Sequence, residues 1–457
     1  MRKLLLLLTA LFTLPTFAVY KMANVVCFVK FADQKDQKWE HDFDYYEKMF
    51  NDVTPGANSV INYFSDMSFG RMEWKSVIVR TEYVDQHSSS YYLEKSSSNP
   101  DGYTNMDLML DTRMKELVKN LCAAIDPQLP AGTVTDADGD GIVDNLVIII
   151  CGDSDISASR MLWPANNVNS NTSVTLAGAR VKNYLKVFDG ANGYKLYVAQ
   201  KINTGVLCHE MTHTLNAFDL YPRKNSTLNP IGVWDLMSDN GIVPQEMSAY
   251  TRMTYGNNFG EWISGSEVET LSEPGEYTLN PLSSPTPDKV VYKIVPSKTK
   301  SEYFLLEYRD KSSQWDKQLP YSGLLVYRVN PGYEGNGGAD NKYELYVFRK
   351  NGSTTSGGFI NNAPLGPETN RTSFGLAEDD DWPFFEDGSR AYFSITDVKI
   401  ADGKVSFRYN NGISAVEEIE IPETSEEDVI YTLQGIRLKR VTSPGIYIIN
   451  GKKVVVK

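Results

Sequence analysis

The chain has 457 residues, of which 41% are hydrophobic and 23% charged, and its formal net charge is −13. A chain of this length exceeds one compact domain, so we expect two or three domains with ordinary globular cores. The excess of negative charge argues against nucleic acids and anionic membrane surfaces as partners.

The first 18 residues have the organisation of a secretory signal peptide. Arg2 and Lys3 supply a positively charged start, residues 4–14 an apolar core, and residues 16–18 a small-residue cleavage site. The apolar core is too short to anchor the chain across a bilayer, and we expect no transmembrane segment further along. The sequence therefore predicts an exported protein, either secreted or held at the cell surface.

Between residues 19 and 262, strand and helix patterns alternate. Residues 25–31 have the pattern of a buried strand, and residues 146–151 are a continuous apolar run rich in β-branched side chains, which is typical of a strand covered on both faces. The other elements expected here are helices at 43–51, 59–68, 107–126 and 244–255 and a strand at 72–81. This alternation predicts an α/β (α+β) catalytic domain that ends near residue 262.

An acidic loop precedes the second of these strands. Asp136, Asp138, Asp140 and Asp144 carry closely spaced carboxylates, and Gly141 permits a sharp turn between them. Such carboxylates can converge on one Ca²⁺ ion, but the glutamate that ends an EF-hand loop is missing, which excludes a true EF-hand. We therefore expect either a related loop with Ca²⁺ as a structural cofactor or a solvated acidic turn.

The most specific pattern is TGVLCHEMTHTLNAFDLY at residues 204–221. It contains His209, Glu210 and His213, the HExxH pattern, and thereby two of the chain's four histidines. Residues four apart lie on one face of a helix, so both imidazoles can point at one zinc ion, with about 2.0–2.1 Å to each nitrogen. Glu210 is rotated away from that face and can reach a water molecule as general base without binding zinc itself.

The residues after this pattern suggest a third ligand. Asn216 tolerates the left-handed conformation that ends a helix, and Pro222 disfavours helical continuation. A turn at Asn216 would return the chain to the histidines and bring Asp219 to the metal as an oxygen ligand. Three protein ligands and one open position are typical of a catalytic zinc site.

The extended motif HExxHxxNxxD resembles that of the metzincin metalloproteases, and most closely the immune inhibitor A family of secreted bacterial enzymes. The resemblance covers most of residues 24–350 and includes VVCFVKFADQ, VINYFSDMSFGRMEW, EYFLLEYRD and LPYSGLLVYRV. It implies a metzincin-like fold, a catalytic Zn²⁺ and an endopeptidase that acts on proteins or peptides. It also implies that Met237, in VWDLM at residues 233–237, forms the methionine-bearing turn beneath the zinc.

Cys27, Cys122, Cys151 and Cys208 lie far apart in apolar segments. Free core thiols are the usual state of such residues, although an oxidising compartment would also permit one disulfide. Cys208 adjoins His209, but neighbouring helical residues point about 100° apart, so we do not expect Cys208 to bind the metal.

From residue 263 to 410 the pattern changes to short alternating runs separated by turns rich in Gly, Pro, Asn and Asp. The runs lie at residues 290–295, 303–309, 323–329, 343–349, 391–398 and 404–408. They predict an all-β sandwich domain of jelly-roll type. Such a domain would either pack on and stabilise the protease or bind a target, and the sequence does not distinguish the two.

The C-terminal part begins with an acidic linker at residues 411–428, which has few aromatic residues and is expected to be flexible. The last residues, 429–457, form a short β module that resembles the C-terminal sorting modules of type IX–secreted proteins of Bacteroidetes. Gly445-Ile446-Tyr447 and Asn450-Gly451-Lys452 carry this resemblance. It implies the secretion machinery as a partner, and the alternative is a terminal hairpin on the β domain.

Two other functions stay open at this level. One is a surface adhesin that binds its target through the β domain and holds a non-catalytic zinc ion. The other is a zinc protease of a different branch, in which Glu246 instead of Asp219 supplies the third ligand. Cleavage preference and oligomeric state depend on loops and surfaces that the sequence does not define.

Overall fold

The computed structural model describes residues 18–105, 109–152, 164–168, 173–190, 201–223, 228–296, 301–338, 342–376, 379, 381–412, 429–433, 436–441, 445–450 and 452–456. Almost all of the predicted signal peptide and of the acidic linker therefore lies outside the described residues. The described part contains both helices and several sheets, which confirms the mixed α/β class. No helix within it is long and apolar enough to cross a membrane.

A five-stranded sheet organises the N-terminal region. Its strand order is β2-β1-β3-β7-β4, with parallel pairing throughout except at the edge strand β4, which runs antiparallel to β7. The strands are β1 Tyr20–Lys30, β2 Met72–Val84, β3 Asn145–Ile150, β7 Asn183–Phe188 and β4 Ala165–Val168. All of β3 is buried, as expected of a parallel strand covered on both faces.

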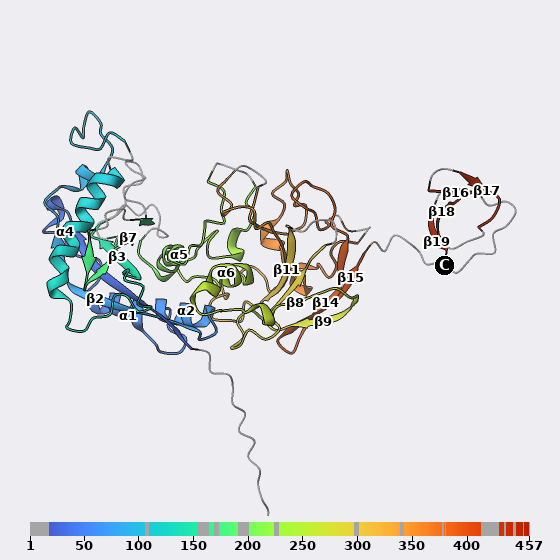
Figure 1. The fold of residues 1–457 in the computed structure, drawn as a ribbon, viewed down its shortest axis with the longest axis horizontal. Helices are drawn as coiled ribbons and strands as arrows, with labels where there is room; N and C mark the ends of the chain where they lie inside the picture. The colour runs from blue at the N-terminus through green and yellow to red at the C-terminus, as the bar shows by residue number, and fades with distance from the viewer. Residues whose placement is uncertain are drawn as a thin grey trace, which may run out of the picture.

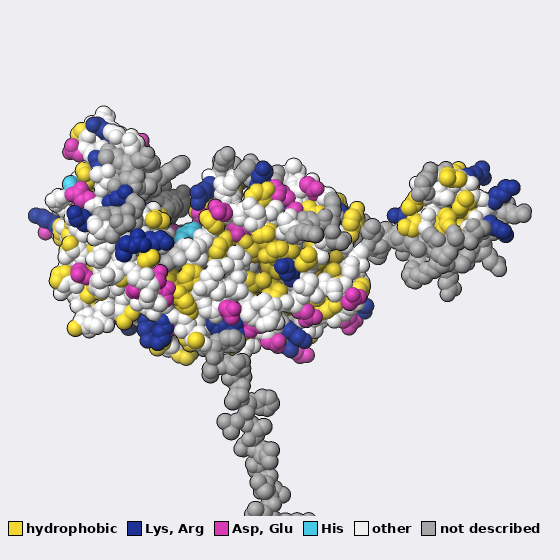
Figure 2. All heavy atoms as spheres, viewed as in Figure 1, with side chains coloured by type: hydrophobic (Ala, Val, Ile, Leu, Met, Phe, Trp, Pro, Cys, Tyr) yellow, Lys and Arg dark blue, Asp and Glu magenta, His cyan; other side chains and the backbone are white. Residues whose placement is uncertain are grey.

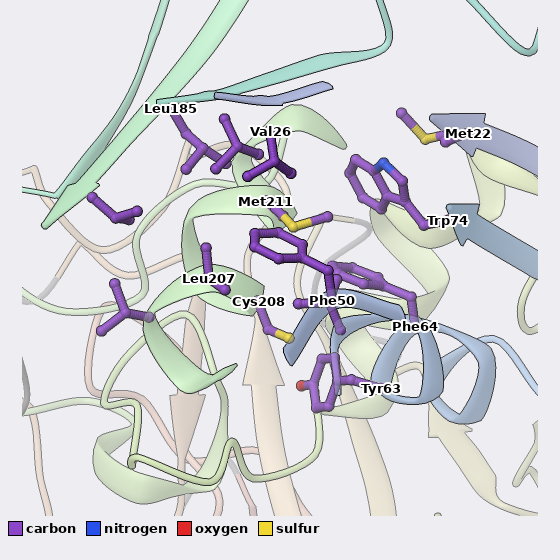
Figure 3. Packing of buried hydrophobic residues seen from close by; sticks show 14 of the residues in the cluster. Met22, Val26, Phe50, Tyr63, Phe64, Trp74, Leu185, Leu207, Cys208 and Met211 are labelled. Carbon is purple, nitrogen blue, oxygen red and sulfur yellow. The ribbon is translucent and has the colours of Figure 1, made fainter. Parts of the chain in front are cut away.

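Helices form a layer on each face of this sheet (Figure 1). Because side chains alternate along a strand, Val25 and Val29 of β1 pack with α4, whereas Val26 and Phe28 pack with α1, α2 and α5. Figure 3 shows this second layer, in which Val26 lies beside Met211 of α5. The helices are α1 Phe43–Asn51, α2 Val60–Met67, α4 Lys115–Ile125, α5 Thr204–Thr214 and α6 Ala249–Thr254.

Two of the predicted helices differ from their expected form. The predicted helix at 244–255 is wrong over its first residues, because helix α6 begins only at Ala249. The backbone amides of Glu246 and Ser248 instead donate to the carboxylates of Asp316 and Asp235, at 3.0 and 2.8 Å. The predicted helix at 107–126 contains a π-helical segment, Met109–Met114, ahead of α4. Tertiary acceptors thus override the local helical pattern.

Two further sheets follow in the β-region, residues 263–412. One has the strand order β13-β12-β11-β10-β8 and the other β14-β15-β9. The strands are β8 Glu269–Thr270, β9 Gly275–Leu279, β10 Val291–Ile294, β11 Tyr303–Arg309, β12 Gly323–Val329, β13 Leu345–Val347, β14 Phe393–Ala401 and β15 Lys404–Asn411. Leu306 and Val326 of the first sheet and Phe407 of the second belong to one hydrophobic cluster. The two sheets therefore share a core, while jelly-roll topology stays a prediction.

The N-terminal region and the β-region are also joined by shared packing. Trp315 of the β-region packs edge-on against Tyr63 of α2, with ring centroids 5.1 Å apart. Its indole Nε1 donates to Asp66 Oδ2 at 2.8 Å. In a second cluster, Met237 packs with Leu305 of β11. Side chains from both regions thus belong to the same hydrophobic clusters.

The remaining strands form two small sheets. Strands β5 Thr175–Leu176 and β6 Ala179–Arg180 pair as a hairpin. The C-terminal module has the order β17-β16-β18-β19, with β16 Ile430–Thr432, β17 Arg437–Leu438, β18 Gly445–Ile449 and β19 Lys452–Val456. Its own small core contains Ile430, Tyr447 and Val454, and the module lies apart from the sheets described above (Figure 1).

The four cysteines, Cys27, Cys122, Cys151 and Cys208, are all buried and free. This is the expected state of core thiols. Burial raises the pKa of the Cys208 thiol well above its ordinary value, because a buried thiolate would lose its hydration.

Truncation of Trp315 tests the packing between the two regions. We expect Trp315→Ala to lower the free energy of unfolding by about 3–5 kcal/mol, the cost of removing a large buried aromatic side chain. The control is Trp382→Ala, because 42% of Trp382 is exposed and its removal leaves no buried cavity. Urea unfolding followed by fluorescence measures both, and equal effects would contradict the shared core.

Candidate metal centre and active site

Helix α5 carries the HExxH residues along the floor of a cleft. Its first turn is capped by Asn203, whose side chain accepts a hydrogen bond from the Val206 amide at 3.0 Å. Gly205 is required there, because a Cβ at this position would lie 1.7 Å from the carbonyl oxygen of Gly241. The close approach of residue 241 therefore positions the start of the helix.

The helix ends where the sequence predicts a turn. Asn216 has a φ of +66°, which is the left-handed conformation that Asn tolerates. The Asn216 amide donates to the His213 carbonyl at 2.9 Å, and the chain then reverses. This reversal brings the carboxylate of Asp219 back to the two imidazole rings.

The side chains of His209, His213 and Asp219 converge, with one potential ligand atom of each within 4.8 Å of the others. Asp219 Oδ1 lies 3.4 Å from His209 Nε2 and 3.3 Å from His213 Nε2. The Nδ1 atoms face the backbone instead, at 3.0 Å from the Leu236 carbonyl and 2.7 Å from the Ala217 carbonyl. Each Nδ1 therefore carries the proton, which leaves both Nε2 lone pairs free for a metal.

These distances fit a zinc ion. Ligands about 2.0–2.1 Å from a tetrahedral zinc lie about 3.3–3.4 Å from one another. Asp219 Oδ1 is also buried and has no hydrogen-bond donor of acceptable geometry among the described residues. A buried carboxylate oxygen without a donor is costly unless a cation compensates it. The residues present thus match the geometry and charge of a two-nitrogen, one-oxygen zinc site.

The charges of the ligands favour a cation at this point. Burial alone lowers the pKa of His209, but contact with Asp219 and the charge of Glu210 outweigh it and raise that pKa to about 9. Burial opposes ionisation of Asp219, but both histidines hold its pKa well below the ordinary range. The Asp219 and Glu210 carboxylates thus favour positive charge at this point, which a metal cation would supply.

Residues 233–237 form the turn that orients His209. The Leu236 carbonyl accepts from His209, and Asp235 Oδ1 accepts from the Met237 amide at 2.7 Å. The Met237 carbonyl accepts from the Leu220 amide at 2.8 Å, so this turn is tied to the residue after Asp219. Met237 is fully buried. Its role as a floor beneath zinc stays a prediction.

A cleft of about 740 Å³ opens over these residues. It is lined by His209, Glu210, His213 and Asp219, and by Ala165, Asn166 and Val168 of the edge strand β4. Figure 2 shows a histidine side chain at the surface in the hollow beside the N-terminal region. Substrate-sized molecules can therefore reach the predicted ligands and Glu210.

Several residues of the cleft were not predicted from the sequence. The Tyr221 ring lies 6.4 Å from the His209 ring with an interplanar angle of 22°, and Arg223 Nη2 lies 3.5 Å from Asp219 Oδ2. Both residues lie within four positions of Asp219 in the sequence, and this closeness to the motif could have indicated that they line the cleft. Asn166 had no such signal, yet its side chain donates to the Glu210 carbonyl at 3.0 Å and to Thr214 Oγ1 at 2.8 Å.

Glu246, the alternative third ligand, lies in a different environment. It is fully buried, and its Oε2 atom accepts from Arg252 Nη2 at 2.7 Å. It neither lines the cleft nor belongs to the group formed by the two histidines and Asp219. The structure thus favours Asp219 over Glu246 as the third ligand.

The acidic loop brings three of its four predicted carboxylates together. Asp136, Asp138 and Asp144 each have an oxygen within 4.8 Å of the others, whereas Asp140 lies outside this group. The Asp140 carboxylate accepts from the Ile142 amide at 2.8 Å instead. Burial raises the pKa of Asp144 to about 6, and the nearby charges of Asp138 and Asp136 add to this shift. The arrangement suits either a bound cation or a partly protonated turn.

Removal of the third ligand tests the metal centre. We expect the wild-type protein to bind one zinc ion per chain in the cleft and Asp219→Ala to weaken binding by more than about 100-fold, since even outer-shell partners are worth 10–100-fold. Asp239→Ala is the control, because Asp239 lines the same cleft outside the ligand group. Competition with a chromophoric chelator measures the affinities. Equal affinity of Asp219→Ala and the wild type would exclude Asp219 as a ligand.

Calcium is tested through stability. If Ca²⁺ binds the acidic loop, a concentration 100 times the Kd should raise the free energy of unfolding by about 2.7 kcal/mol. The double variant Asp136→Asn/Asp138→Asn should abolish this increment, which thermal unfolding with and without Ca²⁺ would detect. If the melting temperature of the wild-type protein is the same with and without Ca²⁺, the loop is a solvated turn.

No protein-family model and no curated protein matches the chain. Among solved structures, wild-type OgpA from Akkermansia muciniphila is 12% identical with a TM-score of 0.30, over 72% of this chain and 79% of that chain. Catalytically inactive OgpA from the same organism, in complex with an O-glycopeptide substrate, is 9% identical with a TM-score of 0.27, over 72% and 83%. Scores this low carry no conclusion about fold or activity, so the function has to be argued from the site itself.

Proposed function

We propose that the protein is a zinc-dependent endopeptidase. The observation that carries this proposal is the spacing of 3.3 and 3.4 Å between Asp219 Oδ1 and the two imidazole Nε2 atoms, at the floor of an open cleft. A structural zinc site is closed by four protein ligands, whereas a catalytic site leaves one position for water or substrate. The third protein ligand and the cleft above it match the catalytic pattern.

Glu210 supplies the proton transfers in this proposal. When bound, zinc makes a water molecule acidic and polarises the substrate carbonyl. Glu210 follows His209 in the same helix, and both line the cleft. Its carboxylate takes the proton of the attacking water and returns it to the leaving amide nitrogen, which converts a poor leaving group into an amine.

The edge strand β4 supplies a binding surface for an extended polypeptide. It pairs with β7 on one side only, and no described strand pairs with its other side. Ala165, Asn166 and Val168 of this strand line the cleft together with His209 and Glu210. An extended peptide can add to such an edge through main-chain hydrogen bonds, which places a peptide bond above the ligand atoms. This surface supports a protein or peptide substrate.

The proposed family and export route of the enzyme depend on its sequence motifs. We propose a metzincin-like enzyme similar to the immune inhibitor A family, with Met237 in the turn beneath zinc. Residues 1–18 direct export, and the module at 429–457 acts as a sorting signal for the secretion machinery. Calcium in the acidic loop is a structural cofactor of this enzyme. The adhesin alternative instead binds its target through the β domain and holds a zinc ion without hydrolysis.

Substitution of the general base tests the proposal. We expect Glu210→Gln to lower the rate of casein hydrolysis by about 10²–10⁴-fold, the usual contribution of general acid–base catalysis, while zinc content stays at one per chain. Glu273→Gln is the control, because Glu273 is exposed and lies outside the cleft. A wild-type protein that binds zinc but cleaves no protein or peptide would contradict the proposal and favour the adhesin.

A further inference from the structure

The peptide segment that carries Asp219 is held from outside the N-terminal region. The backbone amide of Asn336, in the connection between β12 and β13, donates to the Asp219 carbonyl at 2.8 Å. Asn336 Nδ2 donates to the Leu220 carbonyl at 2.8 Å and to the Leu345 carbonyl at 2.9 Å. Its Oδ1 accepts from the Leu345 amide at 3.2 Å. Asn336 is fully buried, and these contacts join the β-region to the third ligand.

Gly335 brings this connection against the ligand segment. It has a φ of +73°, and a Cβ on it would lie 2.5 Å from the Asp219 carbonyl oxygen. Only a glycine therefore allows the two backbones to approach so closely. Any larger residue at 335 has to push the Asp219 peptide away from its place.

The connection between β12 and β13 is also held by hydrogen bonds that link it to helix α6 and to the residue after this helix. The Gly335 amide donates to Glu344, and the same carboxylate accepts from the hydroxyl groups of Tyr250 and Tyr255. Glu344 is buried, so its two oxygens depend on these three donors. Movement of residues 335–336 would leave a buried carboxylate with fewer donors, which is costly.

A second contact from the β-region reaches the turn that orients His209. Arg309 Nη1, at the end of β11, donates to the Trp234 carbonyl at 2.6 Å. Its other nitrogens, Nε and Nη2, bind Asp316 at 2.6 Å each, and the guanidinium is fully buried. The β-region thus contacts both backbone segments, 217–220 and 234–237, that place the ligand side chains.

We infer that the β-region completes the metal centre, with Gly335 and Asn336 as positioning residues for Asp219. This inference rests on the proposed zinc site but goes beyond it, because it assigns the β-region a part in metal binding. A purely structural domain interface would stabilise the fold and leave the zinc affinity of the folded protein unchanged. Positioning residues change that affinity, because they hold a ligand's peptide in register with the other two ligands.

The chain offers matched controls for both positions. Gly375 has a φ of +87°, and a Cβ on it would lie 2.5 Å from the Phe393 carbonyl, so Gly375→Ala creates the same kind of clash inside the β-region. Asn330 is 9% exposed, donates to Glu386 Oε2 at 2.8 Å and accepts from the Gly332 amide at 3.1 Å. Asn330→Leu therefore removes a comparable buried amide without touching residues 217–221.

The test compares Gly335→Ala with Gly375→Ala, and Asn336→Leu with Asn330→Leu, in the full chain. Melting temperature and zinc affinity, by chelator competition, are measured for each. We expect all four variants to melt at lower temperature, but only Gly335→Ala and Asn336→Leu to bind zinc about 10–100-fold more weakly. Unchanged zinc affinity in both, or an equal loss in the two controls, would overturn the inference.

Hydrogen exchange on the wild-type protein gives a second measurement that needs no variant. Removal of zinc with a chelator should speed exchange at the Asn336 amide as well as in residues 217–221, since the two are hydrogen-bonded. If the exchange rate changes only at residues 217–221, the inference about the β-region is wrong, although this result would still agree with the proposed zinc site. A wild-type protein that binds no zinc at all would instead contradict the proposed function.

Discussion

The orientation of two imidazole rings is the constraint on which the rest of the site depends. Each ring donates its Nδ1 proton to a backbone carbonyl, His209 to Leu236 and His213 to Ala217. Rotation of either ring would break a buried or partly buried hydrogen bond, at a net cost of about 0.5–1.5 kcal/mol, and would turn Nε2 away from Asp219. The backbone at 217 and 236 therefore decides where the lone pairs point, and whatever positions that backbone would also position a metal bound there.

Buried ionic groups provide much of this positioning. Arg309, Glu307 and Asp316 are almost fully inaccessible to solvent, as are Glu246 and Arg252. Such pairs add little net stability, because desolvation offsets their attraction, but a partner left alone is strongly destabilising. These pairs therefore favour the one arrangement of the chain in which every buried charge has its partner. Here that arrangement sets Arg309 against the Trp234 carbonyl, two residues before the carbonyl that orients His209.

The sequence predicted those parts of the site whose geometry is local. His209, Glu210 and His213 lie within one helical turn and a half, and the turn at Asn216 follows from its tolerance of positive φ. The parts that were missed depend on contacts between distant residues. Asn336 binds the Leu220 carbonyl across 116 positions of the chain, and nothing in the residues around 336 indicates that partner. The same holds for Asn166, whose partner in α5 is 44 positions away.

The fold shows the same division. Strand β11 agrees with its expected bounds, because the apolar and aromatic run that predicts it lies within one element. The helix expected from residue 244 begins at Ala249, because Asp316 and Asp235, which lie 70 and 13 positions from the amides of Glu246 and Ser248, bind the amides that would have started it. Local patterns thus predict elements, while the ends of elements near the site follow from tertiary hydrogen bonds.

X-ray absorption at the zinc edge, on protein loaded with one equivalent of Zn²⁺, is the measurement that bears most closely on the proposed ligand set. A site of two histidines and Asp219 should give only nitrogen and oxygen scatterers at about 2.0–2.1 Å, with two imidazole signatures, and should lose one light-atom ligand in Asp219→Ala. A sulfur scatterer at about 2.3 Å, or a spectrum that Asp219→Ala leaves unchanged, would contradict this ligand set.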